Sequence, residues 1–158
     1  MIEIIDYKRK YRNNFKLLNE EWIKLHFVLE PHDIEVLDDP EKFILDDGGK
    51  VFFALDTETK QILGTVALVN VNEKGFEIAK MAVSPESRGK RIGKLLMIHA
   101  LEVAQELKAQ RVFLESNTKL EPAINLYLSF GFKEINLAEH PSPYSRANIV
   151  MEILYHYA

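Results

Sequence analysis

The chain has 158 residues, of which 47% are hydrophobic and 28% are charged, and its formal net charge is −4. This length fits one domain with a sizeable core, and the mild negative charge argues against a general role in binding nucleic acid. The sequence contains no cysteine, which excludes disulfides, a cysteine nucleophile and cysteine-ligated zinc.

The first half of the chain predicts one strand, helical segments and then a sheet. Residues 2–7 predict a short strand, and residues 12–28 predict an amphipathic helix with apolar side chains at helical spacing. Residues 30–49 predict short helical turns that end at Gly48 and Gly49. Three strand-like runs with turn-rich connections predict an antiparallel meander, at residues 51–56, 61–71 and 75–83.

The second half alternates helices and strands. Apolar residues recur at intervals of three and four from Ile92 to Leu107, which predicts a helix of about 15 residues. The remaining elements are a buried strand at 111–116, a helix at 121–130, and two closing strands at 132–137 and 148–157. The order β-α-α-β-β-β-α-β-α-β-β predicts a mixed α/β (α+β) fold, with a mostly antiparallel central sheet and helices on both faces.

Nothing in the sequence divides the chain or attaches it to a membrane. We find no repeat, low-complexity tract or linker, and interpret residues 1–158 as a single domain. No apolar segment approaches the roughly 20 residues that cross a bilayer, and the first ten residues lack the apolar run of a signal peptide. We therefore expect a soluble, cytoplasmic protein. The oligomeric state stays open, with a homodimer as one option.

A cluster of cations stands where the helix near Ile92 begins. Arg88, Lys90, Arg91 and Lys94 all lie close to the positive end of that helix dipole, where cations are disfavoured unless an anion binds. Gly89 and Gly93 allow a tight turn and a close approach to the backbone amides. We interpret residues 88–94 as a phosphate site, with a solvated basic turn as the alternative. The motifs GxxxxGK[ST] and GxGxxG are both absent, which disfavours a nucleotide-binding domain.

These residues carry a family resemblance. The segment SRGKRIGKLL, preceded by EIAKMAV and followed by FLESNT and PAINLYLSFGF, resembles the GNAT superfamily of acyl-CoA-dependent N-acyltransferases. In the signature loop Q/R-x-x-G-x-G/A, Arg88 takes the first place and Gly93 the last, while Arg91 replaces the middle glycine. The resemblance implies a GNAT-like domain and an N-acetyltransferase. It would move an acetyl group from acetyl-CoA to a primary amine of a small molecule, amino acid or peptide, by direct attack in a ternary complex.

The resemblance also implies the contacts with acetyl-CoA. The backbone amides of the loop would hold the pyrophosphate, namely those of Arg88, Gly89, Lys90, Arg91, Ile92, Gly93 and Lys94. The main chain of Met81, Ala82 and Val83 would pair with the pantetheine arm. Asn117 and Asn125 would contact the same cofactor, although turn or cap roles are the alternative for both. No metal is expected, because the five histidines form no ligand-spaced pair on one helix.

Glu77 is the candidate general base. Strand alternation places it on one face with Ala79, Met81 and Val83, and places Ile78, Lys80 and Ala82 on the other. A carboxylate partly buried on so apolar a strand should have a raised pKa, which suits a base near neutral pH. The resemblance supports the role, because several histone-acetylating members of the family keep their base at this place. A glutamate exposed to water at a sheet edge is the alternative.

Tyr127 is the candidate general acid. Its apolar neighbours on one helix face favour a core tyrosine. However, NLYLSFGF matches the family segment Y-x-x-x-GF, and the resemblance implies that this tyrosine sits beside the CoA sulfur and gives a proton to the leaving thiolate. No Ser-His-Asp order or nucleophile elbow is present, which favours direct attack over an acyl-enzyme.

The acceptor amine should meet residues 21–33 and 139–146. The first segment is net acidic, which suits a cationic amine, and Arg146 suggests that the acceptor also carries a carboxylate. We predict acceptor contacts from Glu30, His32, Tyr144 and Arg146, whereas Trp22 and His26 could serve packing alone. The alternative function is a non-catalytic acyl-CoA-binding or sensor module.

Overall fold

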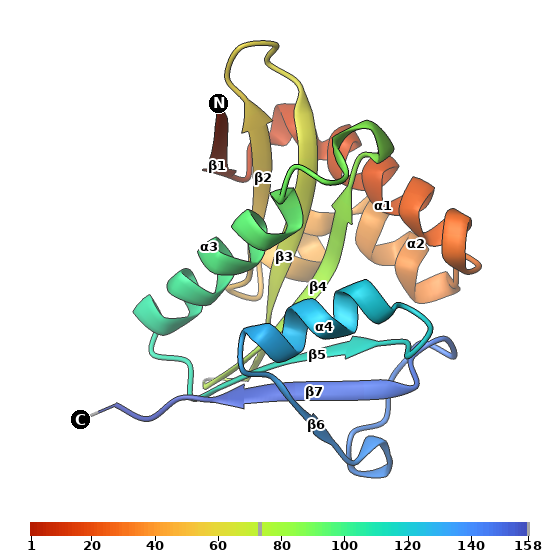
Figure 1. The fold of residues 1–158 in the computed structure, drawn as a ribbon, viewed down its shortest axis with the longest axis vertical. Helices are drawn as coiled ribbons and strands as arrows, with labels where there is room; N and C mark the ends of the chain where they lie inside the picture. Colours follow the sequence, from red (N-terminus) through yellow and green to blue (C-terminus); the bar gives the residue numbers. More distant parts are fainter. Residues whose placement is uncertain (73, 158) are drawn as a thin grey trace.

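A seven-stranded sheet in the order β1-β2-β3-β4-β5-β7-β6 organises the chain in the computed structural model, which describes residues 1–72 and 74–157 (Figure 1). The β4–β5 pair is parallel and the other pairs are antiparallel, so the predicted mixed sheet and α+β fold are confirmed. The strands are β1 (Ile2–Asp6), β2 (Lys50–Asp56), β3 (Ile62–Asn72), β4 (Gly75–Val83), β5 (Arg111–Ser116), β6 (Lys133–Ile135) and β7 (Ile149–Leu154).

The helices lie close to their predicted ranges. The α-helices are α1 (Arg12–His26), α2 (Pro31–Asp38), α3 (Ile92–Glu106) and α4 (Glu121–Ser129). The shorter turns are η1 (Arg9–Tyr11), η2 (Glu41–Leu45), η3 (Pro85–Ser87) and η4 (Leu137–Glu139). Strand β6 is shorter than predicted because the Asn136 side chain accepts a hydrogen bond from the Ala138 amide and starts η4. No helix among the described residues combines the length and apolar character that crossing a bilayer requires.

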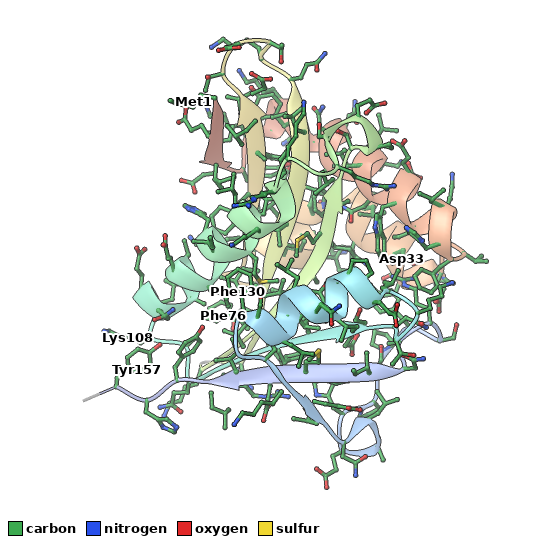
Figure 2. All side chains as sticks on the ribbon, in the orientation of Figure 1. Met1, Asp33, Phe76, Lys108, Phe130 and Tyr157 are labelled. Atoms are coloured by element: carbon green, nitrogen blue, oxygen red, sulfur yellow. The ribbon has the colours of Figure 1, made fainter. Side chains whose placement is uncertain are left out.

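The helices cover both faces of the sheet, as predicted. On one face, α3 and α4 pack over a core to which Phe76 and Phe130, both labelled in Figure 2, belong. On the other face, α1 and α2 bury a separate core around Phe15 and Phe53. Burial of apolar surface on the two sides stabilises the sheet between them.

Strands β4 and β5 separate soon after they meet. Their parallel pairing joins Gly75–Glu77 to Arg111–Phe113, and the strands then diverge, with α4 lying over the widening gap (Figure 1). Within the described residues, the edge of β4 that faces β5 has no strand partner over residues 78–83. The divergence therefore leaves free backbone groups and an opening in the middle of the sheet.

A β-bulge interrupts β4 at Lys80. Ala79 lies opposite Ala67 and Ala82 opposite Thr65, so β4 carries one residue more than β3 in this interval, and Lys80 has a φ of +51°. The bulge reverses the alternation of faces.

As a result, Met81 and Val83 pack with the core under α3, while Ala82 packs with the core under α1. The expectation that Glu77 shares a face with Met81 and Val83 is therefore wrong. The inserted residue breaks the strict alternation of side chains between the two faces of the strand.

Candidate active site

The separated strands enclose a cavity of about 120 Å³. On the same scale roughly 10–15 Å³ is enough to hold one water molecule, so the cavity has room for a small chemical group. Its lining comes from α1, β4, β5, α4 and the loop between β6 and β7. Six residues predicted from the sequence meet there: Glu77, Met81, Asn117, Tyr127, Tyr144 and Arg146.

Glu77 is a buried carboxyl group whose raised pKa leaves only part of it ionised near neutral pH. Burial raises its pKa to about 8, the negative charge of Glu115 contributes in the same direction, and Lys80 opposes the shift. Among the described residues, no side chain donates a hydrogen bond to the Glu77 carboxyl group. A carboxylate in this state is a much stronger proton acceptor than one in water.

Tyr127 faces the same cavity from α4. Its ring lies 6.1 Å from that of Phe132 in an edge-to-face arrangement, which fixes its orientation. Burial raises the pKa of its phenol to about 12, so the hydroxyl group stays protonated. The Tyr127 side chain is thus a proton donor that lines the cavity.

The loop before α3 exposes free backbone amides. The amides of Gly89, Arg91, Ile92, Gly93 and Lys94 have no acceptor among the described residues. Two amides that were predicted to bind phosphate are already used, because Arg88 donates to Pro85 O and Lys90 to Ser87 O, at 3.4 and 3.3 Å. Five free amides at a helix N-terminus nevertheless make an anion site.

The backbone of this loop explains the glycines of the family motif. Arg91 is the N-cap of α3 and lies in the left-handed region with φ +61° and ψ +24°, a conformation that glycine adopts at lower cost. The side chains of Arg88, Lys90, Arg91 and Lys94 are exposed, and within the described residues none has a carboxylate within 4 Å. The loop therefore presents four unpaired cations beside five free amides.

The two predicted asparagines differ in their surroundings. The Asn117 side chain donates to Arg146 O at 2.8 Å and accepts from the Lys119 amide at 3.0 Å. It therefore joins the turn after β5 to the segment between β6 and β7, the late loop (residues 136–148). Asn125 is exposed on α4. The cofactor contacts of both residues stay predictions.

The predicted acceptor residues belong to a buried ionic network. Arg146 donates two hydrogen bonds of 2.7 Å to the Asp33 carboxylate, and its guanidinium lies 3.4 Å from Glu30. Lys80 donates to Asp33 and to the Tyr144 hydroxyl group, both at 2.7 Å. Asp33 is fully buried, Lys80 is only 6% exposed, and Asp33 lies on α2 (Figure 2).

This network changes the interpretation of Arg146. Burial would raise the pKa of Asp33, but hydrogen bonds from Arg146 and Lys80 outweigh it and lower that pKa to about 2. Because Arg146 already has a full carboxylate partner, it is no longer an argument for a carboxylate on the acceptor. His32 is exposed, and its ring lies 5.4 Å from the Tyr144 ring at the edge of the network.

Sequence reasoning missed three residues of this site. Lys80 lies on the strand face predicted to be apolar, Glu115 lies in the predicted buried strand, and Asp33 lies in the segment 21–33 without being one of the predicted contacts. A signal was present, because Lys80 and Glu115 are charged residues within strands that are mostly apolar or largely buried.

The comparison with known proteins agrees with this geometry. The sequence model of the Acetyltransferase (GNAT) family matches residues 12–132. The chain therefore belongs to the GNAT family and is an acyl-CoA-dependent acetyltransferase.

Individual relatives match at moderate identity. An uncharacterized N-acetyltransferase of Schizosaccharomyces pombe is 29% identical over 125 residues, which cover 77% of this chain and 76% of the yeast protein. N-acetyltransferase 8B of Rattus norvegicus is 33% identical over 101 residues, or 61% of this chain and 45% of the rat protein.

Solved structures share the fold over nearly the whole chain. A GNAT acetyltransferase from Staphylococcus aureus superposes with a TM-score of 0.86 at 24% identity, covering 96% of this chain and 98% of the other. Spermidine N-acetyltransferase from Vibrio cholerae, in complex with CoA and spermine, gives a TM-score of 0.72 at 22% identity, with 97% and 95% coverage.

Proposed function

We propose that this chain transfers the acetyl group of acetyl-CoA to a primary amine by direct attack. The observation that carries the proposal is the cavity between β4 and β5, in which a proton acceptor, Glu77, and a proton donor, Tyr127, meet beside the unpaired edge of β4. Attack by an amine needs a proton acceptor, and a proton donor assists the departure of the thiolate.

The residues present fit CoA. The free amides and the unpaired cations of residues 88–94 would hold its pyrophosphate, and the open edge of β4 at Met81–Val83 would pair with its pantetheine arm. When bound, acetyl-CoA supplies an acetyl group activated as a thioester. The loop and the strand edge lead to the same cavity, because Met81 lines it.

Glu77 prepares the amine. At neutral pH an alkylammonium ion has no free electron pair, so one N–H proton must leave before nitrogen can attack. The ionised form of Glu77 takes that proton, and its share grows as pH rises towards the Glu77 pKa of about 8. Tyr127 holds the proton that the leaving sulfur needs, and its pKa of about 12 prevents loss of that proton beforehand.

The cavity favours a cationic amine that carries no carboxylate beside its reacting end. Glu77 and Glu115 line the cavity, whereas Lys80 and Arg146 are both bound to Asp33. The Vibrio cholerae protein of the same fold binds spermine and is named for spermidine acetylation. Polyamines therefore belong among the first acceptors to test, with small monoamines, amino acids and peptide N-termini.

Turnover with a panel of amines tests the proposal. Acetylated amine, identified by mass spectrometry, should form in equal amount to free CoA thiol. Glu77→Gln and Tyr127→Phe should each lower kcat at least about tenfold, while acetyl-CoA affinity stays within about twofold.

Exposed Glu102→Gln on α3 is the matched control and should keep full activity. Tight binding of acetyl-CoA without consumption against any amine would instead support a sensor module.

A further inference from the structure

Glu115 lies on the strand next to Glu77, at the point where the two strands separate. Glu77 pairs in register with Phe113 of β5, and Glu115 follows two residues later on the same face. Both glutamates line the cavity. The Glu115 side chain is only 8% exposed, which is unusual for a carboxylate without an Arg or Lys partner.

The late loop holds the Glu115 carboxylate in place. The Ser142 hydroxyl group donates to one carboxylate oxygen at 2.8 Å, and His140 Nε2 lies 3.7 Å from the other. The Ser142 hydroxyl group in turn accepts from the Tyr144 amide at 3.0 Å, and the His140 ring packs edge-on against Phe113. These contacts hold the Glu115 side chain at a defined place in the cavity wall.

We propose that Glu115 is a second functional carboxylate of this centre, which strengthens Glu77 as a proton acceptor and helps to hold the acceptor's ammonium group. This inference rests on the proposed function. One N–H bond of the ammonium breaks, the electron pair remains on nitrogen, and the proton passes to a Glu77 carboxylate oxygen. Glu115 takes no proton in this step, and its carboxyl group lies in the cavity wall that the positively charged amine meets.

Other charged and titratable groups lie around Glu77 and Glu115, and they do not cancel the effect of Glu115 on the pKa of Glu77. They come from α2, β4, α4 and the late loop, and are Asp33, Lys80, Tyr127, His140, Tyr144 and Arg146. Lys80 and Arg146 both bind Asp33, so much of their charge is already balanced. After burial, the charge of Glu115 is the largest contribution that raises the pKa of Glu77.

Titration of Glu77 itself tests this proposal without relying on turnover. The full chain is labelled with ¹³C at glutamate carboxyl carbons, and the Glu77 signal is assigned by its loss in Glu77→Gln. In Glu115→Gln, the midpoint of the Glu77 titration should fall by about one pH unit, because a neighbouring like charge has been removed. Glu102→Gln, which removes an exposed carboxylate on α3, should leave the midpoint unchanged.

A second variant keeps the test decisive if Glu115→Gln does not fold. Glu115→Asp draws the charge back by one methylene and should give a smaller shift in the same direction. An unchanged Glu77 midpoint in the folded variants would overturn the proposal and leave Glu115 as an anchor of the late loop. If no amine is acetylated at all, the proposed function fails, yet the titration still decides whether the two carboxylates are coupled.

Kinetic measurements add a test that distinguishes a functional Glu115 from one that only anchors the late loop. With an acceptor amine, the acidic limb of the kcat/KM profile should shift to lower pH in Glu115→Gln, by the same amount as the titration. The acceptor KM should rise severalfold while acetyl-CoA affinity is unchanged. A loss of activity with an unmoved acidic limb would count against the coupling.

Discussion

At the scale of single residues, the protonation of Glu77 is coupled to folding. Burial raises its pKa to about 8, whereas an unfolded glutamate titrates near 4.5. Between these values the folded protein binds a proton that the unfolded chain does not. The free energy of unfolding therefore decreases as pH rises through this window, by on the order of 3 kcal/mol for such a group beside a water-accessible cavity.

Glu77→Gln should remove this pH dependence. Urea unfolding at pH 5 and pH 9 should show that the wild type loses stability relative to the variant as pH rises, by about 3 kcal/mol. Glutamine is neutral at both values and has nearly the same shape, so the difference reports the charge alone. Exposed Glu102→Gln should follow the wild type. Parallel stability curves for Glu77→Gln and wild type would show that Glu77 titrates normally.

Sequence reasoning located Glu77 and Tyr127 because each stands out from its own element. A glutamate in an apolar strand and a tyrosine in a family segment are visible locally, and the structure brings both to one cavity. Glu115 and Asp33 were not identified, because their roles depend on neighbours from other segments. Ser142 lies 27 residues from Glu115, and Arg146 lies 113 residues from Asp33.

At the scale of elements, the start of α3 shows how a glycine can serve ligand binding rather than folding. Gly93 is the second residue of α3, and a Cβ built on it would meet only Met81 Sδ, at an ordinary contact distance of 3.9 Å. Helix propensity would favour alanine at this position. Glycine instead leaves the free amides of the first turn accessible to a phosphate group.

Gly93→Ala should therefore separate stability from binding. Thermal unfolding should show a gain of up to about 1 kcal/mol, because alanine is the better helix former. Calorimetry should show at least about tenfold weaker CoA binding, because the methyl group stands beside the amides proposed to bind phosphate.

Gly131→Ala is the contrasting control. Gly131 has φ +95° after α4, and its Cβ would meet nothing within 4 Å. This substitution should cost about 1 kcal/mol through backbone strain and leave CoA affinity unchanged. Equal CoA affinity in Gly93→Ala and wild type would place the pyrophosphate elsewhere.

The order of elements could be predicted from the sequence, whereas the bulge in β4 could not. Periodicity of apolar residues and the positions of Gly and Pro marked α3, α4 and most strands within a few residues. A bulge inserts a single residue without changing composition, so nine residues of β4 read as a regular strand. Its result is a buried Lys80, which could be recognised only from the register with β3.

At the scale of the whole molecule, one ionic network joins three distant segments, which are α2, β4 and the late loop. Asp33 from α2 binds Lys80 of the β4 bulge and Arg146 of the late loop. Glu30 accepts from the Ser145 amide at 3.0 Å and also belongs to the capping box of α2. Two carboxylates therefore tie α2 to the late loop, and the fully buried one, Asp33, also binds Lys80.

Asp33→Asn should weaken this arrangement as a unit. The variant leaves the buried Lys80 and the partly buried Arg146 without their shared counter-charge, which typically costs about 3 kcal/mol or more. The effect should appear at pH 7, since Asp33 has a pKa of about 2 and loses its contribution to stability only as pH falls from about 4 towards that value. Urea unfolding at pH 7 and pH 3 measures the difference between wild type and variant, which should narrow at the lower pH.

The same variant tests whether the network shapes the acceptor site. In Asp33→Asn the acceptor KM should rise at least about fivefold, because α2 and the late loop lose their common anchor, while acetyl-CoA affinity should stay unchanged because residues 88–94 are not part of the network. Asp38→Asn breaks the exposed Asp38–Lys16 ion pair of 2.7 Å and should change neither stability nor acceptor KM appreciably. A change confined to acetyl-CoA binding, or an unchanged acceptor KM in a destabilised Asp33→Asn, would mean that the network supports the fold and that the acceptor binds elsewhere.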